Sequence, residues 1–186
     1  MEEKKITVLV AMAEGFEEIE AIVPIDLFRR AGYAVVVAGV DGTEIRGAHD
    51  ITVACDANIE DVGTDFDALV LPGGGLGSKN LAASWIVNEK ILLTFNSGAV
   101  LAAICAAPAV VLGPTGLLEG RKAVCFPGSE TYAPQIEFGT ERVCVDGNLI
   151  TARAAGCAVE FALAIIEKLS GKKHADAIAE RILFTR

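Results

Sequence analysis

The sequence predicts an α/β fold in which a mostly parallel β-sheet is covered by helices on both faces. Three observations lead to this prediction. Short apolar runs rich in β-branched residues alternate with longer amphipathic segments, the connections between them are short, and no linker or internal repeat breaks the pattern. The length of 186 residues suits one domain, which we place at residues 1–186.

The first half of the chain contains the clearest alternation. The apolar run at residues 6–12 is typical of a strand buried on both faces. A helix is predicted over residues 17–31, where apolar residues recur at helical spacing, with a kink or a short first turn at Pro24. Residues 33–40 indicate a second strand, and residues 42–54 a short hairpin at the edge.

The second half continues the pattern. Further strands are expected at three apolar runs, residues 66–71, 100–104 and 123–126. Residues 78–96 are expected to contain helical material, and helices are expected at residues 106–112, 157–169 and 174–183. A hairpin is predicted with strands at 142–145 and 149–152, because the Asp146-Gly147-Asn148 sequence between them favours a tight turn.

Composition excludes several classes of function. A net charge of −9 and a pI near 4.7 argue against binding to nucleic acid or to an anionic membrane surface. The longest apolar run, residues 99–112, contains Pro108 and is shorter than the roughly 20 residues of a membrane span. The five cysteines form no C-x-x-C pair, and with only two histidines we expect no metal site. These features predict a cytoplasmic protein with free thiols.

Cys105 is the first candidate for chemistry. It stands between an apolar strand and a predicted helix, and small alanines flank it on both sides. A side chain at such a sharp turn is presented at the edge of the sheet, as in a nucleophile elbow. The start of a helix also offers free N–H groups, which lower the pKa of a thiol. The alternative is a buried core cysteine, the commoner fate of a free thiol, and spacing alone does not separate the two.

Glu20 is the second candidate. Glu17 and Glu18 are explained by the dipole of the predicted helix, whose first turn favours acidic residues. Glu20 is expected to lean inward over the ends of the strands. A carboxyl group held there without a cation would have a raised pKa and could share a proton with a thiolate.

The glycine-rich loop at residues 72–77 follows a buried strand. It lacks the Lys-Ser/Thr of a phosphate-binding loop, which disfavours a nucleotide and leaves no organic cofactor predicted. We interpret its glycines as backbone that aims N–H groups at a developing oxyanion, with a plain loop as the alternative. His174 is expected to be exposed near the C-terminus, whereas His49 in the hairpin could approach a neighbouring subunit.

Five segments together resemble the ThiJ/PfpI superfamily, and within it the branch of the parkinsonism-associated deglycase and its bacterial relatives. The resemblance is collinear from residue 6 to about residue 183. The matching segments are Glu17-Glu18-Ile19-Glu20, Arg29-Arg30-Ala31-Gly32, Leu71-Pro72-Gly73-Gly74, Ala102-Ala103-Ile104-Cys105-Ala106 and Glu160-Phe161-Ala162-Leu163.

The resemblance implies a flavodoxin-like three-layer sandwich that forms a homodimer. It implies Cys105 as an oxidation-sensitive nucleophile and Glu20 as its protonated partner, with N–H groups of Gly73, Gly74 and Ala106 at the oxyanion site. Members of the family are credited with cofactor-free conversion of methylglyoxal to lactate and with deglycase activity on early glycation adducts. Others act as oxidative-stress sensors or chaperones.

The chain departs from the family pattern at four positions. Phe126 stands where the glyoxalase members have a histidine, and its ring cannot relay a proton. Ala106 follows the nucleophile where the protease members have a histidine, so we do not expect a peptidase. His49 replaces an arginine of the hairpin, and Cys157 brings a second thiol to a turn expected near the site.

The leading prediction is therefore a cofactor-independent cysteine enzyme acting on small reactive aldehydes or glycated substrates. The alternative is an oxidative-stress sensor or chaperone that responds through oxidation of Cys105 with little or no turnover. The alternatives share the same thiol, and measured turnover separates them.

Overall fold

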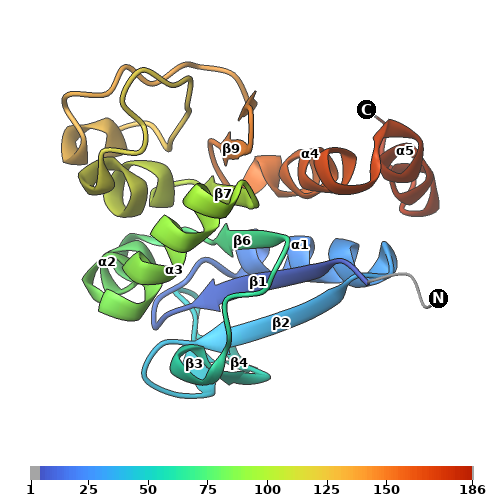
Figure 1. The fold of residues 1–186 in the computed structure, drawn as a ribbon, viewed down its shortest axis with the longest axis horizontal. Coiled ribbons are helices and arrows are strands. Elements are labelled where there is room, and N and C mark those ends of the chain that lie inside the picture. The colour runs from blue at the N-terminus through green and yellow to red at the C-terminus, as the bar shows by residue number, and fades with distance from the viewer. Residues whose placement is uncertain (1–4, 186) are drawn as a thin grey trace.

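The computed structural model describes residues 5–185 and contains the expected mostly parallel sheet (Figure 1). Seven strands form it, in the spatial order β5 (Ala57–Asn58), β2 (Ala34–Gly39), β1 (Thr7–Met12), β6 (Ala68–Leu71), β7 (Val100–Ile104), β9 (Leu149–Ala152) and β8 (Val143–Asp146). Only the β8–β9 hairpin pairs antiparallel in this sheet. A separate antiparallel ribbon consists of β3 (Glu44–Arg46) and β4 (Thr52–Ala54).

Helices cover both faces of the sheet, which gives the three layers predicted from the sequence. One face packs against α1 (Glu18–Arg30), α4 (Ala158–Ser170) and α5 (Lys172–Arg181). The other packs against α2 (Gly75–Ala83) and α3 (Trp85–Ser97). Within the described residues no helix has the length and apolar character that crossing a membrane requires.

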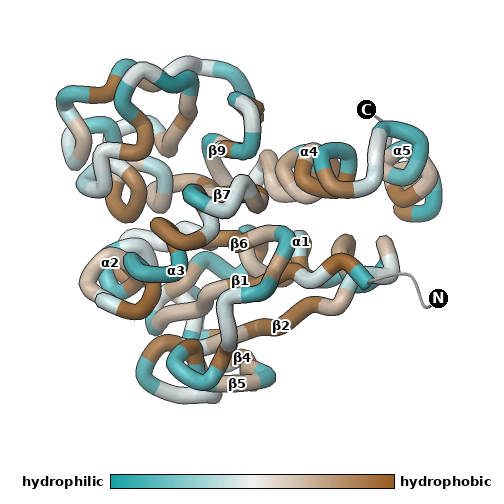
Figure 2. The backbone as a smooth tube through the Cα atoms, viewed as in Figure 1, coloured by the Kyte–Doolittle hydropathy of each residue, from teal (hydrophilic) through white to brown (hydrophobic). Residues whose placement is uncertain are grey.

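The residues of β1 show why the strands are apolar along their whole length (Figure 2). Val8, Val10 and Met12 lie in the core beneath α1 and α4, whereas Leu9 and Ala11 lie in the opposite core. Successive side chains of a strand point to opposite faces, so a sheet covered on both sides needs an unbroken apolar run. The unbroken apolar run at residues 6–12 therefore correctly predicted a strand buried on both faces.

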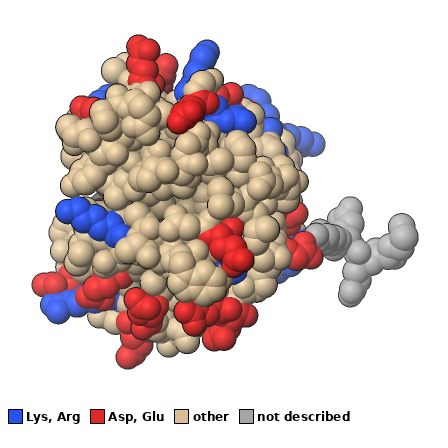
Figure 3. All heavy atoms as spheres, turned by 60° about the vertical axis from the view of Figure 1, so that its left-hand side comes forward, with Lys and Arg blue, Asp and Glu red and all other residues tan. Residues whose placement is uncertain are grey.

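The surface is consistent with the acidic composition. In Figure 3 the acidic side chains are concentrated in the lower part of the face shown, on the side of β3 and β4, and the middle of that face is largely uncharged. The five cysteines are all free thiols in the described structure.

The prediction of a strand at residues 123–126 is wrong. The Val124 N–H donates to the Thr151 side-chain oxygen at 2.9 Å, and the Phe126 N–H donates to the Cys105 carbonyl oxygen at 2.8 Å. These hydrogen bonds reach a side chain and a residue beyond the end of β7, so they form no regular ladder with a neighbouring strand. The segment instead crosses the carboxyl end of the sheet and brings Phe126 next to the backbone of Cys105.

The helical material expected at residues 78–96 forms two helices, because Ser84 takes an extended conformation, ends α2 and caps α3. The prediction of a helix at residues 106–112 needs correction, since the segment forms a short π-helical turn over Pro108–Leu112. The helix expected at residues 17–31 is α1, which continues through Pro24.

Candidate active site

Cys105 occupies a sharp turn immediately after β7. Its backbone φ is +65°, and only three other non-glycine residues in the described chain have a positive φ. The turn is held from both sides, because the Cys105 N–H donates to the Ala152 carbonyl and the Cys105 carbonyl accepts from Phe126, each at 2.8 Å. A non-glycine residue held in this region stores strain that the surrounding structure must impose, which is the backbone geometry of a nucleophile elbow.

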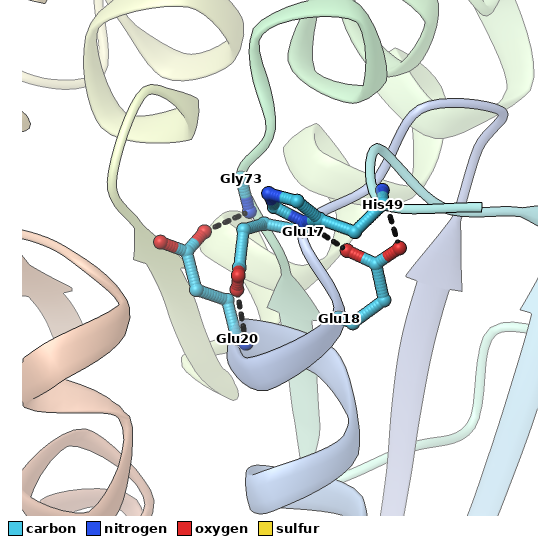
Figure 4. A network of polar contacts seen from close by, with 5 residues as sticks. All are labelled: Glu17, Glu18, Glu20, His49 and Gly73. Carbon is cyan, nitrogen blue, oxygen red and sulfur yellow. Dashed lines mark hydrogen bonds and ion pairs between the residues drawn. The ribbon is translucent and has the colours of Figure 1, made fainter. Parts of the chain in front are cut away.

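Glu20 lies beside this thiol on the first turn of α1. The helix begins there because the Glu17 carboxylate accepts from the Glu20 N–H at 2.8 Å, as an N-cap does. The Glu20 side chain points back into the protein and is only 1% exposed. One oxygen, Oε2, accepts from the Gly73 N–H at 3.0 Å, as Figure 4 shows. The other, Oε1, has no hydrogen-bond partner of normal geometry in the described chain.

Gly73 lets the two side chains approach each other. A Cβ atom on Gly73 would collide with Glu20 Oε2, and it would lie 2.7 Å from Cys105 Cβ and 2.9 Å from the Ile104 carbonyl oxygen. Glycine is therefore required here by space, and φ plays no part. The Gly73 N–H, which was predicted to line an oxyanion site, donates to Glu20 in this structure.

Burial shifts the pKa values of both Glu20 and Cys105. Burial, assisted by the nearby charge of Glu17, raises the pKa of Glu20 from 4.5 to about 7. Burial also raises the pKa of the Cys105 thiol, and an ionised Glu20 raises it further, whereas the N–H groups of Ala106 and Gly74 lower it. The expectation of a thiol acidified by a helix terminus is thus wrong while Glu20 is ionised. Once the proton lies on Glu20, its charge no longer opposes the thiolate.

A second polar pair lies next to this site and was not predicted. Glu18 is buried, and its carboxylate accepts from the His49 N–H at 2.6 Å and is hydrogen-bonded to His49 Nδ1 at 2.8 Å (Figure 4). Sequence reasoning assigned Glu18 to the helix dipole, because nothing local indicated that the tip of the β3–β4 ribbon would reach it.

Among residues 5–185, one group of side chains brings atoms that could bind a metal close together, and the Glu18–His49 pair belongs to it. The donor atoms of Glu17, Glu18 and His49 all lie within 4.8 Å of one another. However, Glu17 caps α1, and Glu18 is bonded to His49. Each donor is thus already engaged, so we assign no ion to the group.

Phe126, His174 and Cys157 were also singled out from the sequence. Phe126 is 45% exposed and cannot exchange a proton. His174 is partly buried, with Nε2 at 3.0 Å from the Ala31 carbonyl oxygen, whereas the sequence analysis expected it to be exposed. Cys157 is buried at the start of α4. In the same turn, the N–H of Ala155 lowers the pKa of Glu20.

Comparisons with known proteins agree with one another. The model of the DJ-1/PfpI family matches residues 4–168. Protein dj-1beta of Drosophila melanogaster is 38% identical over 182 residues, covering 94% of this chain and 95% of that protein. A deglycase of Pyrococcus abyssi is 33% identical over 156 residues, covering 80% of this chain and 90% of that protein. The solved structure of oxidised Toxoplasma gondii DJ-1 superposes with a TM-score of 0.93 at 39% identity, covering 97% of this chain and 100% of that one.

We expect Gly73→Ala to damage the site, because the added methyl group has no space between Glu20 and Cys105. Overpacking of this kind costs about 1–3 kcal/mol of unfolding free energy. Gly75→Ala is the matched control, since a Cβ there meets no atom within 4 Å. Urea unfolding of the two variants checks the prediction, and equal midpoints would show that a methyl group does fit between Glu20 and Cys105.

Glu20→Gln should alter how stability depends on pH. Because the pKa of Glu20 is raised on folding, the folded state holds the proton at a higher pH than the unfolded chain. The stability this provides is fully present below pH 4.5 and is lost as pH rises to about 7. Relative to the glutamine variant, the wild type should lose on the order of 3 kcal/mol over this range. Unfolding free energies that stay parallel from pH 4 to 8 would contradict the raised pKa.

Proposed function

The chain belongs to the DJ-1/PfpI family, and from this premise we propose that it is a cofactor-independent cysteine enzyme acting on small reactive aldehydes. The observation that carries the proposal is the half-buried thiol of Cys105, held at a strained turn against the buried carboxyl of Glu20. A structural cysteine has no need of a carboxyl group with a raised pKa beside it. The deglycase name of the Pyrococcus abyssi relative supports carbonyl compounds as the substrate class.

The first step is addition of the thiol to the aldehyde. The Cys105 proton passes to Glu20, and the sulfur forms a bond to the aldehyde carbon to give a hemithioacetal. Negative charge develops on the carbonyl oxygen, and Glu20 then gives the proton to this oxygen, which completes the hemithioacetal and returns Glu20 to its carboxylate form. The N–H groups of Gly74 and Ala106, which lie against the sulfur in the free protein, are placed to stabilise this charge.

The second step moves a proton within the bound substrate. With methylglyoxal, Glu20 as carboxylate takes the proton from the former aldehyde carbon and returns it to the neighbouring carbon, while the hydroxyl proton moves from the first oxygen to the second. This isomerisation converts the hemithioacetal into a lactoyl thioester on Cys105. A pKa near 7 suits a group that must accept and release a proton at neutral pH. Hydrolysis then releases lactate and regenerates the thiol.

We further propose that the protein acts as a homodimer in the cytoplasm. Three isoleucine side chains, Ile19 and Ile22 of α1 and Ile51 at the tip of the ribbon, are exposed on elements that meet at the Glu18–His49 pair. Exposed apolar side chains grouped in this way favour an interface. Free cysteines fit a reducing compartment. Sedimentation of wild type and Ile22→Glu tests the interface: two monomeric species would contradict it.

Purified protein should convert methylglyoxal to lactate without added metal or cofactor. Cys105→Ala should abolish lactate formation, since no other group forms the carbon–sulfur bond. Glu20→Ala should reduce it by about 10²–10⁴-fold, the usual contribution of a positioned acid or base. Cys144→Ala is the control, because Cys144 lies on the edge strand β8. Absence of lactate from the wild type would remove the proposal.

The alternative function is sensing of oxidants through the same thiol. It is favoured by one specific observation, that the similar Toxoplasma gondii protein was solved in an oxidised form. A sulfenic or sulfinic group on Cys105 would lie next to the Glu20 carboxyl, which can donate a hydrogen bond to it when protonated. Mass spectrometry after mild peroxide treatment tests this role. Oxygen gained by Cys55 or Cys144 while Cys105 stays reduced would exclude it.

A further inference from the structure

Hydrolysis of the thioester requires a base that the proposed reaction has not yet supplied. A water molecule must lose a proton as it attacks the thioester carbon. Glu20 is poorly placed for this step, because it is 1% exposed and one of its oxygens is held by Gly73. Phe126, whose N–H donates to the Cys105 carbonyl oxygen, has no titratable nitrogen. A second group near the sheet edge would complete the cycle.

The Glu18–His49 pair has the construction of an oriented base. The Glu18 side chain is 8% exposed and the His49 side chain is 69% exposed, so a buried carboxylate holds an accessible imidazole. Space for the carboxylate depends on Gly47, since a Cβ there would collide with Glu18. The ribbon tip is fixed to the β1–α1 turn by two backbone hydrogen bonds, Gly15 N–H to Arg46 O at 2.7 Å and Ala48 N–H to Phe16 O at 2.8 Å.

The hydrogen bonds also determine which nitrogen of His49 is free. The pKa of Glu18 lies below its usual value, because the hydrogen bonds from His49 outweigh the effect of burial. In the neutral imidazole the ionised carboxylate accepts from Nδ1–H, and the lone pair is on Nε2. The same hydrogen bond to Glu18 raises the pKa of His49, so the ring is a stronger base than a free imidazole. A buried carboxylate orients the catalytic histidine of serine hydrolases in the same way.

The imidazole is directed toward the candidate active site. In Figure 4 it extends from the ribbon toward the N-terminus of α1, and its second nitrogen points away from Glu18, on the side of Gly73. Its ring also lies near Glu17, whose donor atom is within 4.8 Å of those of Glu18 and His49. Glu17 in turn accepts the N–H of Glu20. The Glu17 side chain therefore lies close both to His49 and to the first turn of α1, which carries Glu20.

We propose that His49, oriented by Glu18, is the base that activates water to hydrolyse the Cys105 thioester. The inference rests on the proposed aldehyde chemistry. Nε2 takes a proton from water, and the hydroxide oxygen bonds to the thioester carbonyl carbon. The carbon–sulfur bond then breaks and its electron pair returns to the Cys105 sulfur. The product leaves as lactate, and the imidazolium releases its proton to solvent.

The test separates this step from the earlier ones. Wild type, His49→Asn and His174→Asn are each mixed with methylglyoxal, quenched in acid and analysed by mass spectrometry. A hemithioacetal dissociates on quenching, whereas a thioester survives and is removed by hydroxylamine. His49→Asn should form lactate about 10²–10⁴-fold more slowly and accumulate the hydroxylamine-sensitive adduct on Cys105. His174→Asn, the matched control, should behave as wild type.

Two further measurements distinguish a catalytic from a structural role. The His49 side chain is 69% exposed in the single chain, and its role requires the proposed dimer interface at Ile22 and Ile51 to leave Nε2 open to water. Added imidazole should then restore turnover to His49→Ala. Glu18→Gln should slow hydrolysis in the wild-type background and have no further effect when His49 is already asparagine, as expected of a positioning residue.

The possible failures differ from one another. An unchanged lactate rate in His49→Asn, or a slow rate without the thioester adduct, overturns the role of His49 and leaves the proposed function standing. A wild type that forms no lactate overturns both.

Discussion

The candidate site depends on one close contact, the packing of the Glu20 carboxyl against Cys105 across a glycine that has no side chain. The contact removes the carboxyl from water, and the loss of hydration raises its pKa to about 7. It also makes the charge of each group unfavourable for the other, so the two behave as a pair that shares one proton. The nucleophilic form of the thiol then requires a protonated Glu20.

The order of strands in the sheet explains how this contact arises. The strands β1, β6 and β7 are neighbours and parallel, so their carboxyl ends meet at one edge. The turn after β1 leads to Glu20, the turn after β6 contains Gly73, and Cys105 follows β7. Ligand sites in open α/β sheets lie at this edge. The ribbon after β2 adds His49 from the side, through its bond to Glu18.

Much of this arrangement could be predicted from the sequence, because the signals were local. The apolar runs located the central strands, and the position of Cys105 between a strand and small residues indicated a sharp turn. Features that depend on distant partners were missed. Residues 123–126 look like a strand by composition, yet their N–H groups bond to Thr151 and Cys105. The Gly73 N–H was expected at an oxyanion site and donates to Glu20. The helix expected to acidify the thiol is a short π-helical turn, and the charge of Glu20 acts in the opposite direction.

The most direct test of the shared proton is the pH dependence of Cys105 alkylation by iodoacetamide, followed by mass spectrometry in wild type and Glu20→Gln. A neutral amide keeps the shape of the protonated carboxyl but removes the charge that opposes thiolate formation. We predict that the midpoint of alkylation lies at lower pH in Glu20→Gln than in the wild type. Identical midpoints in the two proteins would contradict the electrostatic coupling between Glu20 and Cys105.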